Sequence, residues 1–432
     1  MTSSRRAPMH FTAAAKRAEA KDPGKGMSPP GGTPRSAAPS GHTATDSGER
    51  PVEIRRWPVE KGRWSVETRR DESALAELGE ELRDLYQRSP AATPFQAHQW
   101  LAAWWDSYGT PGRLRLILVR CDGRLVAAAA LMSSRRWGFP VLLPLAEAQS
   151  DFADFLLDPA YEEDAIRNLR RALLDEPGWC ALDLREVRPG SVAHAVAERW
   201  PRRTWRMPAS ICFEIPVTDL TELFARLSGR AAKKMRAKLR KIDASGITVE
   251  PVPAEQAAQA VHTLLDLHEQ QWRDRSINPE HTRDRFRRHL AAAMSGLIHD
   301  GQAAMFQYRQ DGRVLASNAL VVGHRFLGAY LYGAAPELRT MVDISLVFMR
   351  QDLMVGLERD LPAVSFLRGE EPYKLKWRPQ PVRNERLILG RSAAAIAFAG
   401  VARARLAARR YVRGDTGASQ QTPRRPGIEA HG

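Results

Sequence analysis

Apolar residues recur along much of the chain at two characteristic spacings. Four leucines between residues 73 and 87 are separated by three or four positions, which is the spacing of one face of a helix. Short runs in which apolar and polar residues alternate, the first beginning at Trp64, predict strands. The helical spacing predicts four further helices, which begin near Thr93, Glu162, Leu220 and Asp343.

Two hairpins give the clearest local signal. One strand pattern, the dipeptide Asp122-Gly123 and a second strand pattern follow one another directly, and the same order returns around Asp311-Gly312. An Asp-Gly pair readily adopts the positive φ angles that a two-residue hairpin turn requires. Both segments are therefore predicted to be antiparallel hairpins.

The two hairpins also resemble each other in sequence. DGRLVAAAAL begins at Asp122 and DGRVLASNAL begins at Asp311, 189 residues later. A second landmark, a Leu-Arg dipeptide after a strand pattern, recurs at Arg185 and Arg368, 183 residues apart. Two landmarks at nearly equal offsets predict an internal duplication, with coincidence between two common hairpins as the alternative.

The predicted fold class is α/β, with a mixed sheet in each of two halves. Each half has the order strand, helices, hairpin, strand, helix, strand. The proposed bounds are 51–215 for the first domain, expected to be non-catalytic, and 216–377 for the second, expected to hold the active site. Residues 1–50 are rich in Pro and Gly with few large apolar side chains, so they are predicted to be a disordered tail. Residues 378–432 are interpreted as a basic, partly helical tail.

Most of the net charge of +15 lies in the two tails. Residues 1–50 carry +4 and residues 378–432 carry +8, so the charge says little about the core. No run of about 20 apolar residues occurs and no secretory signal is found, which predicts a cytoplasmic protein. Contact of the basic segments with the inner face of the membrane is a further expectation.

Several kinds of site are disfavoured by the residues that are missing. The three cysteines form no CxxC pair and the histidines have no metal-binding spacing, so neither disulfides nor a metal is predicted. The phosphate loop GxxxxGK[ST], the dinucleotide motif GxGxxG and the nucleophile elbow GxSxG are also absent. These absences disfavour phosphoryl transfer, dinucleotide redox chemistry and the common serine-hydrolase plan.

The densest group of polar residues is FLRGEEPYKLKW at residues 366–377, directly after a predicted strand. Ligands in α/β proteins commonly bind at the carboxyl ends of strands. This segment, TPFQAHQWLAAWWDSYG at 93–109 and QSDFADFLLD at 149–158 together resemble the CelD/BcsL-type acetyltransferases of the GNAT superfamily. The resemblance covers about residues 64–378. It implies tandem GNAT-like domains, an acyl-CoA co-substrate such as acetyl-CoA, and a role in exopolysaccharide or cell-envelope biosynthesis.

Acyl transfer needs a base, a polarised acyl carbonyl and a proton for the leaving group. Glu371 is the candidate base and Tyr373 the candidate acid. The alternatives are that Glu370 and Glu371 only pair with Arg368 and Lys374, and that Tyr373 only packs. The candidate binding residues for donor or acceptor are Arg368, Glu370, Lys374, Lys376 and Trp377.

The usual GNAT pyrophosphate loop, (Q/R)xxGx(G/A), has no clear copy in this chain. Its expected place reads GAAPELRTMV at 333–342, before a predicted helix. Free amides of Ile344 and Ser345 at the helix start would suit a phosphate, but Asp343 fits an N-cap and its charge opposes one.

Three functions compete at this stage. The leading one is an acyl-CoA-dependent N- or O-acyltransferase acting on a small-molecule or saccharide acceptor. A Fem-like aminoacyl transferase would instead use aminoacyl-tRNA and the eight cations of residues 226–241. The third is a non-enzymatic peripheral component of a polysaccharide-synthesis complex. No specific nucleic-acid partner is expected for the leading function.

Overall fold

The strands of the first half follow the predicted order in the computed structural model, which describes residues 54–58, 62–272 and 278–412. Each strand of this half pairs antiparallel with its neighbour until β5, which pairs parallel with β7. A short strand, β6 (Leu156–Leu157), pairs with β4. The strands, in the order of the sheet, are β1 (Ile54–Pro58), β2 (Arg63–Arg69), β3 (Leu114–Cys121), β4 (Arg124–Arg136), β5 (Phe139–Pro144) and β7 (Ala181–Val187).

The second half repeats this order. Its strands also pair antiparallel until β12, which pairs parallel with β13. They are β9 (Thr248–Pro251), β10 (Ala303–Gln310), β11 (Arg313–Val322), β12 (Leu327–Ala334) and β13 (Ala363–Arg368). The predicted α/β class and the two tandem mixed-sheet halves are thereby confirmed.

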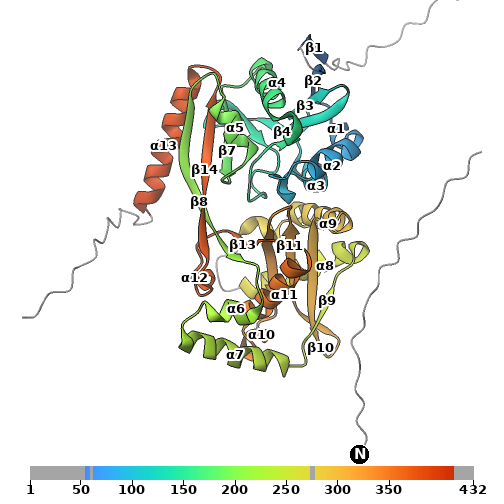
Figure 1. Ribbon diagram of the computed structural model, residues 1–432, viewed down its shortest axis with the longest axis vertical. Helices are drawn as coiled ribbons and strands as arrows, with labels where there is room; N and C mark the ends of the chain where they lie inside the picture. Colours follow the sequence, from blue (N-terminus) through green and yellow to red (C-terminus); the bar gives the residue numbers. More distant parts are fainter. Residues whose placement is uncertain (1–53, 59–61, 273–277, 413–432) are drawn as a thin grey trace, which may run out of the picture. The chain divides into compact units, whose positions relative to one another are not determined.

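Two long strands join the halves, because each of them pairs with a strand of the other half. β8 (Thr204–Pro216), which ends the first half in sequence, pairs with β13 of the second half. β14 (Gln380–Gly390), which follows the second half, pairs with β7 of the first. β8 and β14 pair with each other, so one sheet runs through both halves (Figure 1). Residues 380–390 fall within the basic tail predicted from the sequence. That prediction is wrong for these residues, because they form a central strand of the sheet.

The two predicted hairpins are confirmed, and they match in detail. Asp122 and Gly123, like Asp311 and Gly312, have positive φ angles, as the turn requires. Each hairpin also has a register shift at the same place, between Val119 and Arg120 in one and 189 residues later in the other. A shared irregularity of this kind favours duplication over coincidence.

Helices from both halves pack into one apolar core on one face of the sheet. α3 and α9 contact each other across the boundary between the halves, and Trp100 of α3 lies edge-on to His289 of α9. The predicted helix at 73–87 is interrupted at Leu78. The helices of this layer are α1 (Ala74–Glu77), α2 (Gly79–Gln87), α3 (His98–Tyr108), α8 (Ala257–Trp272) and α9 (Asp284–His299).

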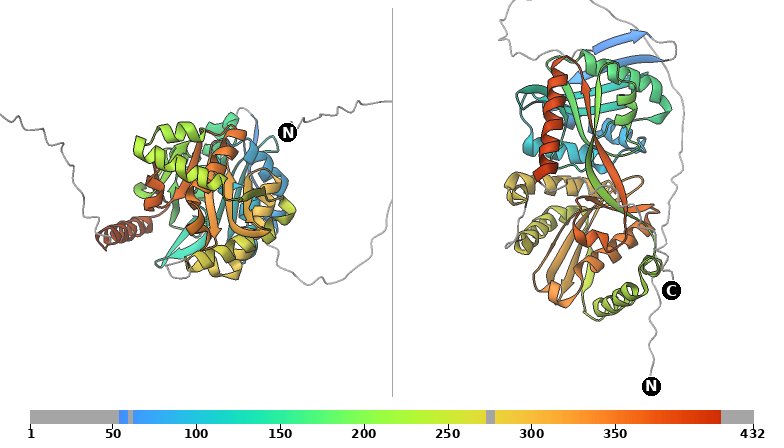
Figure 2. Two further views of the ribbon diagram at one scale, coloured as in Figure 1. Left: turned by 90° about the horizontal axis from the view of Figure 1, so that it is seen from below. Right: turned by 90° about the vertical axis from the view of Figure 1, so that its left-hand side faces the viewer.

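The remaining helices pack against three separate apolar clusters. α4 and α5 cover the first half, α6, α7 and α11 cover the second, and α13 lies beside β14 and β8 (Figure 2). The predicted helix at 220–242 is divided, because Ser228 caps a new helix start. These helices are α4 (Glu162–Asp175), α5 (Val192–Glu198), α6 (Leu220–Ala225), α7 (Gly229–Asp243), α10 (Leu338–Met341), α11 (Ile344–Glu358), α12 (Pro372–Leu375) and α13 (Ala394–Val412).

Short 3-10 turns occupy four of the connections, at Pro94–Gln96, Pro159–Tyr161, Ala254–Gln256 and Pro279–Thr282. The three cysteines are free and buried. Across the described residues, no helix combines the length and apolarity needed to span a bilayer. The predicted tail at 1–50 lies outside the described residues, as does the end of the chain after 412.

Candidate active site

The predicted segment 366–377 begins in β13 and turns sharply into α12. Leu367 and Gly369 both have positive φ angles, and the pairing of β13 with β8 shifts register between Ser365 and Arg368. A β-carbon on Gly369 would lie 2.5 Å from a carboxylate oxygen of Glu371. The positive φ of Gly369 favours glycine here, whereas the exposed Glu371 side chain could move away from an added β-carbon.

Lys374 holds this turn together from inside. Its side chain is buried, and its ammonium donates to the carbonyls of Arg368 at 3.0 Å and Gly369 at 3.1 Å. It also pairs with Glu371 at 2.7 Å, while the Glu371 side chain remains 52 % exposed. The structure thus brings the candidate base together with Lys374, as the ion-pair alternative expected. Glu370 is exposed.

Arg368 has a different partner from the one expected. Its Nε donates to Asp151 at 2.5 Å, so it does not pair with either glutamate of its own segment. Asp151 lies in the loop between β5 and β6, in the other half of the chain. This ion pair therefore links the two halves.

Lys376 and Trp377 lie at the beginning of α11, beside the predicted binding residues Ile344 and Ser345. The ammonium of Lys376 is 4.8 Å from the centre of the Trp377 ring and contacts both Ser345 and Asp343. Trp377 is completely buried, and its Nε1 has no partner among the described residues.

Asp343 is the N-cap of α11, as expected from its position. Its carboxylate accepts from the backbone of Leu346 and pairs with Lys238 of α7 as well as Lys376. Burial favours a higher pKa for Asp343, but the two lysines and Ser345 lower that pKa below its usual range. The carboxylate stays ionised, and two cations surround it.

Tyr373 is 41 % exposed, at the edge of the same region. Burial of its hydroxyl raises the pKa of Tyr373 above its ordinary value, with smaller contributions from Tyr332 and Glu371. The hydroxyl therefore keeps its proton at neutral pH and can donate a hydrogen bond, although the raised pKa makes it a weaker acid than an ordinary tyrosine.

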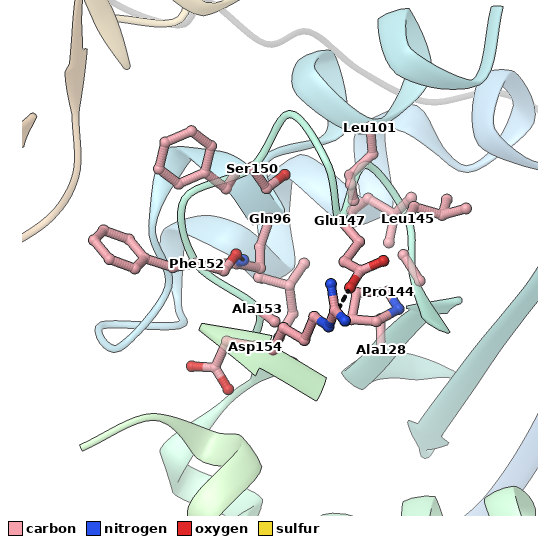
Figure 3. Close-up of a pocket in the computed structure, with 15 residues that line it drawn as sticks. Gln96, Leu101, Ala128, Pro144, Leu145, Glu147, Ser150, Phe152, Ala153 and Asp154 are labelled. Atoms are coloured by element: carbon pink, nitrogen blue, oxygen red, sulfur yellow. Dashed lines mark hydrogen bonds and ion pairs between the residues drawn. The ribbon is translucent and has the colours of Figure 1, made fainter. Parts of the chain in front are cut away.

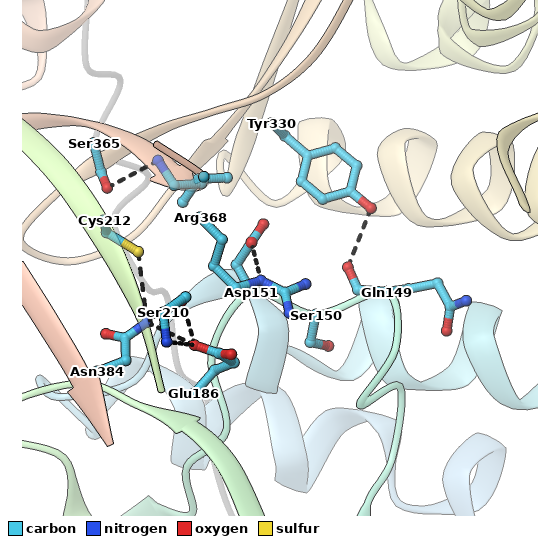
Figure 4. A network of polar contacts seen from close by, with 12 residues as sticks. Gln149, Ser150, Asp151, Glu186, Ser210, Cys212, Tyr330, Ser365, Arg368 and Asn384 are labelled. Atoms are coloured by element: carbon cyan, nitrogen blue, oxygen red, sulfur yellow. Dashed lines mark hydrogen bonds and ion pairs between the residues drawn. The ribbon is translucent and has the colours of Figure 1, made fainter. Parts of the chain in front are cut away.

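A second polar centre, which sequence reasoning did not assemble, joins the halves around Arg368 (Figure 4). Tyr330 of β12 donates to the carbonyl of Gln149 at 3.2 Å, beside the Arg368–Asp151 pair. Trp100 donates to Ser150 at 2.9 Å. Tyr330 is also the extra residue of a bulge in β12, and β5 of the first half pairs with β4 without such a shift.

The same centre continues into the exchanged strands. Glu186 at the end of β7 accepts from Ser210 of β8 and from Asn384 of β14. The amide of Asn384 also contacts the thiol of Cys212 at 3.5 Å. The carboxyl ends of β7 and β13 therefore both contribute polar side chains to the middle of the sheet. This arrangement forms because segments that are far apart in the sequence come together in the folded chain. No local sequence pattern therefore predicts it.

A small cavity lies in the first half beside the loop that follows β5. The loop after β5 folds back over β7, where Ala153 donates to the carbonyl of Glu186. The remaining cavity has a volume of about 30 Å³, between Phe152, Glu147 and Arg185 (Figure 3). A space of that size holds a water molecule but no cofactor.

A larger groove of about 710 Å³ lies in the second half between β9, β10 and α11. None of the residues 368–377 lines it. Among the described residues, no group of three or more His, Cys, Asp or Glu is arranged to hold a metal.

Comparison with known families identifies the fold. The model of the acetyltransferase (GNAT) domain family matches residues 53–141 and 229–375, which is more than half of the chain. The chain belongs to this family. The GNAT match spans the two predicted halves, so the tandem arrangement and the superfamily expected from the sequence are both confirmed.

Solved structures of similar fold have low sequence identity to this GNAT protein. FemX is 13 % identical with a TM-score of 0.54, and the match covers 72 % of this chain and 95 % of FemX. L-PGS from Bacillus licheniformis is 11 % identical with a TM-score of 0.49, over 77 % of this chain and 97 % of that one. No curated protein matches the sequence. The FemX likeness shows a shared fold.

Proposed function

We propose that this protein is an acyl-CoA-dependent N- or O-acyltransferase whose donor binds in the second half. Membership of the GNAT family supports an acyltransferase-like chain. The choice of donor and of half goes beyond the family match and depends on the charges around two corresponding helices.

One observation carries the choice of half. α4 follows β5 and β6 in the first half, and α11 follows β12 in the second, where β5 and β12 are the strands that pair parallel with the next long strand of their half. The first turns of the two helices differ in charge. α4 begins with Glu162, Glu163 and Asp164, which repel an anion. α11 begins beside Lys238 and Lys376, which outnumber Asp343. A CoA pyrophosphate is therefore favoured only at α11.

The strands next to α11 separate as those of the first half do, where β5 and β7 also pair at only two positions. In the first half, however, the backbone of Ala153 bonds to Glu186 beside β7. β12 and β13 pair at only two positions, Leu327 with Val364 and Gly328 with Ser365, and are not paired beyond them. Backbone groups of these strands are left without a sheet partner there and can bond to an extended ligand. The thioester would then lie near the end of β13, close to Glu371 and Tyr373.

The proposed reaction follows from these positions. The acceptor amine or hydroxyl attacks the thioester carbonyl, Glu371 takes the acceptor proton, and the C–S bond breaks. Tyr373 donates its proton to the departing thiolate, which leaves as the CoA thiol, and the proton taken up by Glu371 returns to Tyr373 through water. Arg368, Glu370 and Trp377 would contact the acceptor or shape its site, while Lys374 holds the turn that carries Glu371.

The test is release of CoA thiol from acetyl-CoA in the presence of mixed amine and hydroxyl acceptors. The proposal predicts acceptor-dependent thiol release that Tyr373→Phe lowers. Absence of thiol release with a folded protein that also fails to bind acetyl-CoA would contradict it.

Aminoacyl transfer in the manner of Fem-type enzymes is a second candidate. α7 carries Arg230, Lys233, Lys234, Arg240 and Lys241 as exposed cations, and no acid precedes Asp243 in the helix. Such a face attracts a polyanion such as tRNA. Titration with charged tRNA against acetyl-CoA distinguishes the two donors, and the leading proposal predicts that only acetyl-CoA binds saturably.

The cellular role belongs to the proposal as well. The resemblance of residues 366–377 to CelD/BcsL-type enzymes suggests acyl transfer in exopolysaccharide or envelope biosynthesis in the cytoplasm. α7 and α13 would then contact the anionic inner face of the membrane. Sedimentation with phosphatidylglycerol vesicles, compared with neutral phosphatidylcholine vesicles, tests this contact. Equal sedimentation with both would argue against it.

A further inference from the structure

The loop that follows β5 contacts both strands that border the proposed donor site. β12 and β13 pair at only two positions and then separate. Two residues beyond the last paired residue of β12, the hydroxyl of Tyr330 donates to the carbonyl of Gln149 at 3.2 Å. Three residues beyond the last paired residue of β13, the Nε of Arg368 donates to Asp151 at 2.5 Å. One short loop of the first half therefore bridges the two strands just beyond the point where they stop pairing (Figure 4).

This loop is itself held in place by α3. The indole of Trp104 donates to the side chain of Gln149 at 2.7 Å. The indole of Trp100 donates to Ser150 at 2.9 Å, and both tryptophans are buried in the core that the two halves share. The Asp151 side chain is only 12 % exposed. Groups that are fixed by buried packing and hydrogen bonds can hold their own partners in one geometry.

The end of β13 is strained, so it depends on contacts that hold it. Leu367, directly before Arg368, has a φ of 54°, which is uncommon for a residue with a β-carbon. Such a conformation persists only where the surrounding structure determines it. Lys374 holds the turn from within, through the carbonyls of Arg368 and Gly369. The ion pair with Asp151 holds the same turn from the other half of the chain.

The place of this turn matters for the proposed reaction. Glu371, the candidate base, lies three residues after Arg368. An extended donor would lie between the separated ends of β12 and β13, and a base must come within hydrogen-bond reach of the acceptor proton. A displacement of about 1 Å in such a site can lower turnover by about 10²-fold. Contacts that set the separation of the two strands therefore also set the rate.

We propose that Asp151 is a positioning residue, through which the first half sets the separation of β12 and β13 and the place of the turn that carries Glu371. Its carboxylate acts on the site only through Arg368. The consequence for acyl transfer rests on the proposed function. The effect of Asp151 on the two strands does not.

Hydrogen–deuterium exchange of the full chain, measured by mass spectrometry, tests the contact without any activity. Asp151→Ala removes the acceptor. Residues 329–334 and 365–371 should then exchange about tenfold or more faster than in the wild type, because a hydrogen bond between charged groups is lost. Asp151→Asn keeps an oxygen acceptor and should restore part of the protection.

Asp158→Ala is the matched control. Asp158 is also a buried aspartate of the first half, and its partner Arg88 belongs to the same half. Its removal should lower stability in a similar way but leave exchange in β12 and at the end of β13 as it is in the wild type.

Thiol release from acetyl-CoA tests the consequence in the same variants. Asp151→Ala should lower turnover by about 10²-fold and change acetyl-CoA affinity much less, with Asp151→Asn between it and the wild type. Circular dichroism gives the folded fraction of each protein, and Asp158→Ala should keep normal turnover per folded molecule. If Asp151→Ala does not fold, Asp151→Asn provides both comparisons.

Two results would overturn the proposal. One is exchange in the two strands that the Asp151 variants leave unchanged or that Asp158→Ala accelerates equally. The other is faster exchange with normal turnover, which would make Asp151 a structural contact only. A wild type that releases no thiol, with exchange that responds as predicted, contradicts the proposed function but not the hold of Asp151 on the strands.

Discussion

Glu371 is the residue whose role is most open to direct test. Glu371→Gln preserves its shape and hydrogen bonding but cannot take a proton. If Glu371 is the base, turnover should fall by about 10²–10⁴-fold while acetyl-CoA affinity changes little. Steady-state rates of thiol release, with folding checked by circular dichroism, measure this effect.

The ion pair with Lys374 defines the contrary outcome. If Glu371 only neutralises the buried Lys374 ammonium, turnover should stay near normal and the thermal midpoint should fall. That result would assign Glu371 to the support of the β13 turn. The base would then belong to another side chain near Arg368.

Asp352 gives a prediction about stability and pH. It is buried in α11 and accepts from Asn318 at 3.2 Å, and burial raises its pKa to about 8. The folded state therefore keeps a proton that the unfolded chain releases above about pH 4. Between about pH 4 and pH 8 the titration of Asp352 therefore lowers the free energy of unfolding of the protein as the pH rises, by at most about 1.4 kcal/mol per pH unit.

Asp352→Asn imitates the protonated form and removes this dependence. Urea unfolding of the wild type and the variant at pH 5 and pH 8 measures this dependence. The contributions of Asp154 and of all other titratable groups cancel, because both proteins contain them. The variant should gain stability relative to the wild type as the pH rises. A constant difference between the two proteins across this range would show that Asp352 is ionised in the folded state.

Among the elements, the hairpins could be predicted and β14 could not, for a physical reason. A two-residue turn is specified by its own dipeptide, so Asp122-Gly123 and Asp311-Gly312 identify both turns. β14 owes its place to β7 and β8, and its first residues carry charges among the arginines of the tail. The apolar residues Leu387, Ile388 and Leu389 are the only local signal for a strand here. The many arginines around them favour a basic tail instead, which is why the strand is missed from the sequence.

β14 also gives the prediction at this scale. A chain that ends at residue 378 lacks the strand between β7 and β8, which leaves two long edges of the sheet unpaired. We expect it to be insoluble or to lose its cooperative thermal transition. A chain that ends at residue 412 keeps every described strand and serves as the control. Normal melting of the shorter chain would contradict the central position of β14.

For the molecule as a whole, the duplication could be predicted from sequence but the joint between the halves could not. Matching landmarks establish the repeat, whereas the exchange of β8 and β14 depends on pairing between segments about 170 residues apart. The candidate site shows the same limit. The sequence indicates both Lys376 and Ser345 as binding residues, and the two side chains are in contact. The pairing of Arg368 with Asp151 could not be predicted, because it depends on the folded chain.

Residues 1–50 give a further prediction at this scale. Their composition offers little apolar surface to bury, so their removal should leave the thermal midpoint nearly unchanged. Differential scanning fluorimetry of the full chain and of residues 51–432 measures the difference. A large decrease after truncation would show that the segment contributes to the fold.

Binding of acetyl-CoA at the beginning of α11 is the central claim, and calorimetric titration tests it most directly. Wild-type protein should bind one acetyl-CoA, and Lys376→Met should bind it about tenfold more weakly, because one charged contact to phosphate is lost. Arg167→Met, in the corresponding helix α4, is the matched control and should bind as the wild type does. Equal affinity of the Lys376→Met variant, or weaker binding only in the Arg167→Met variant, would contradict the assignment of the donor to the second half.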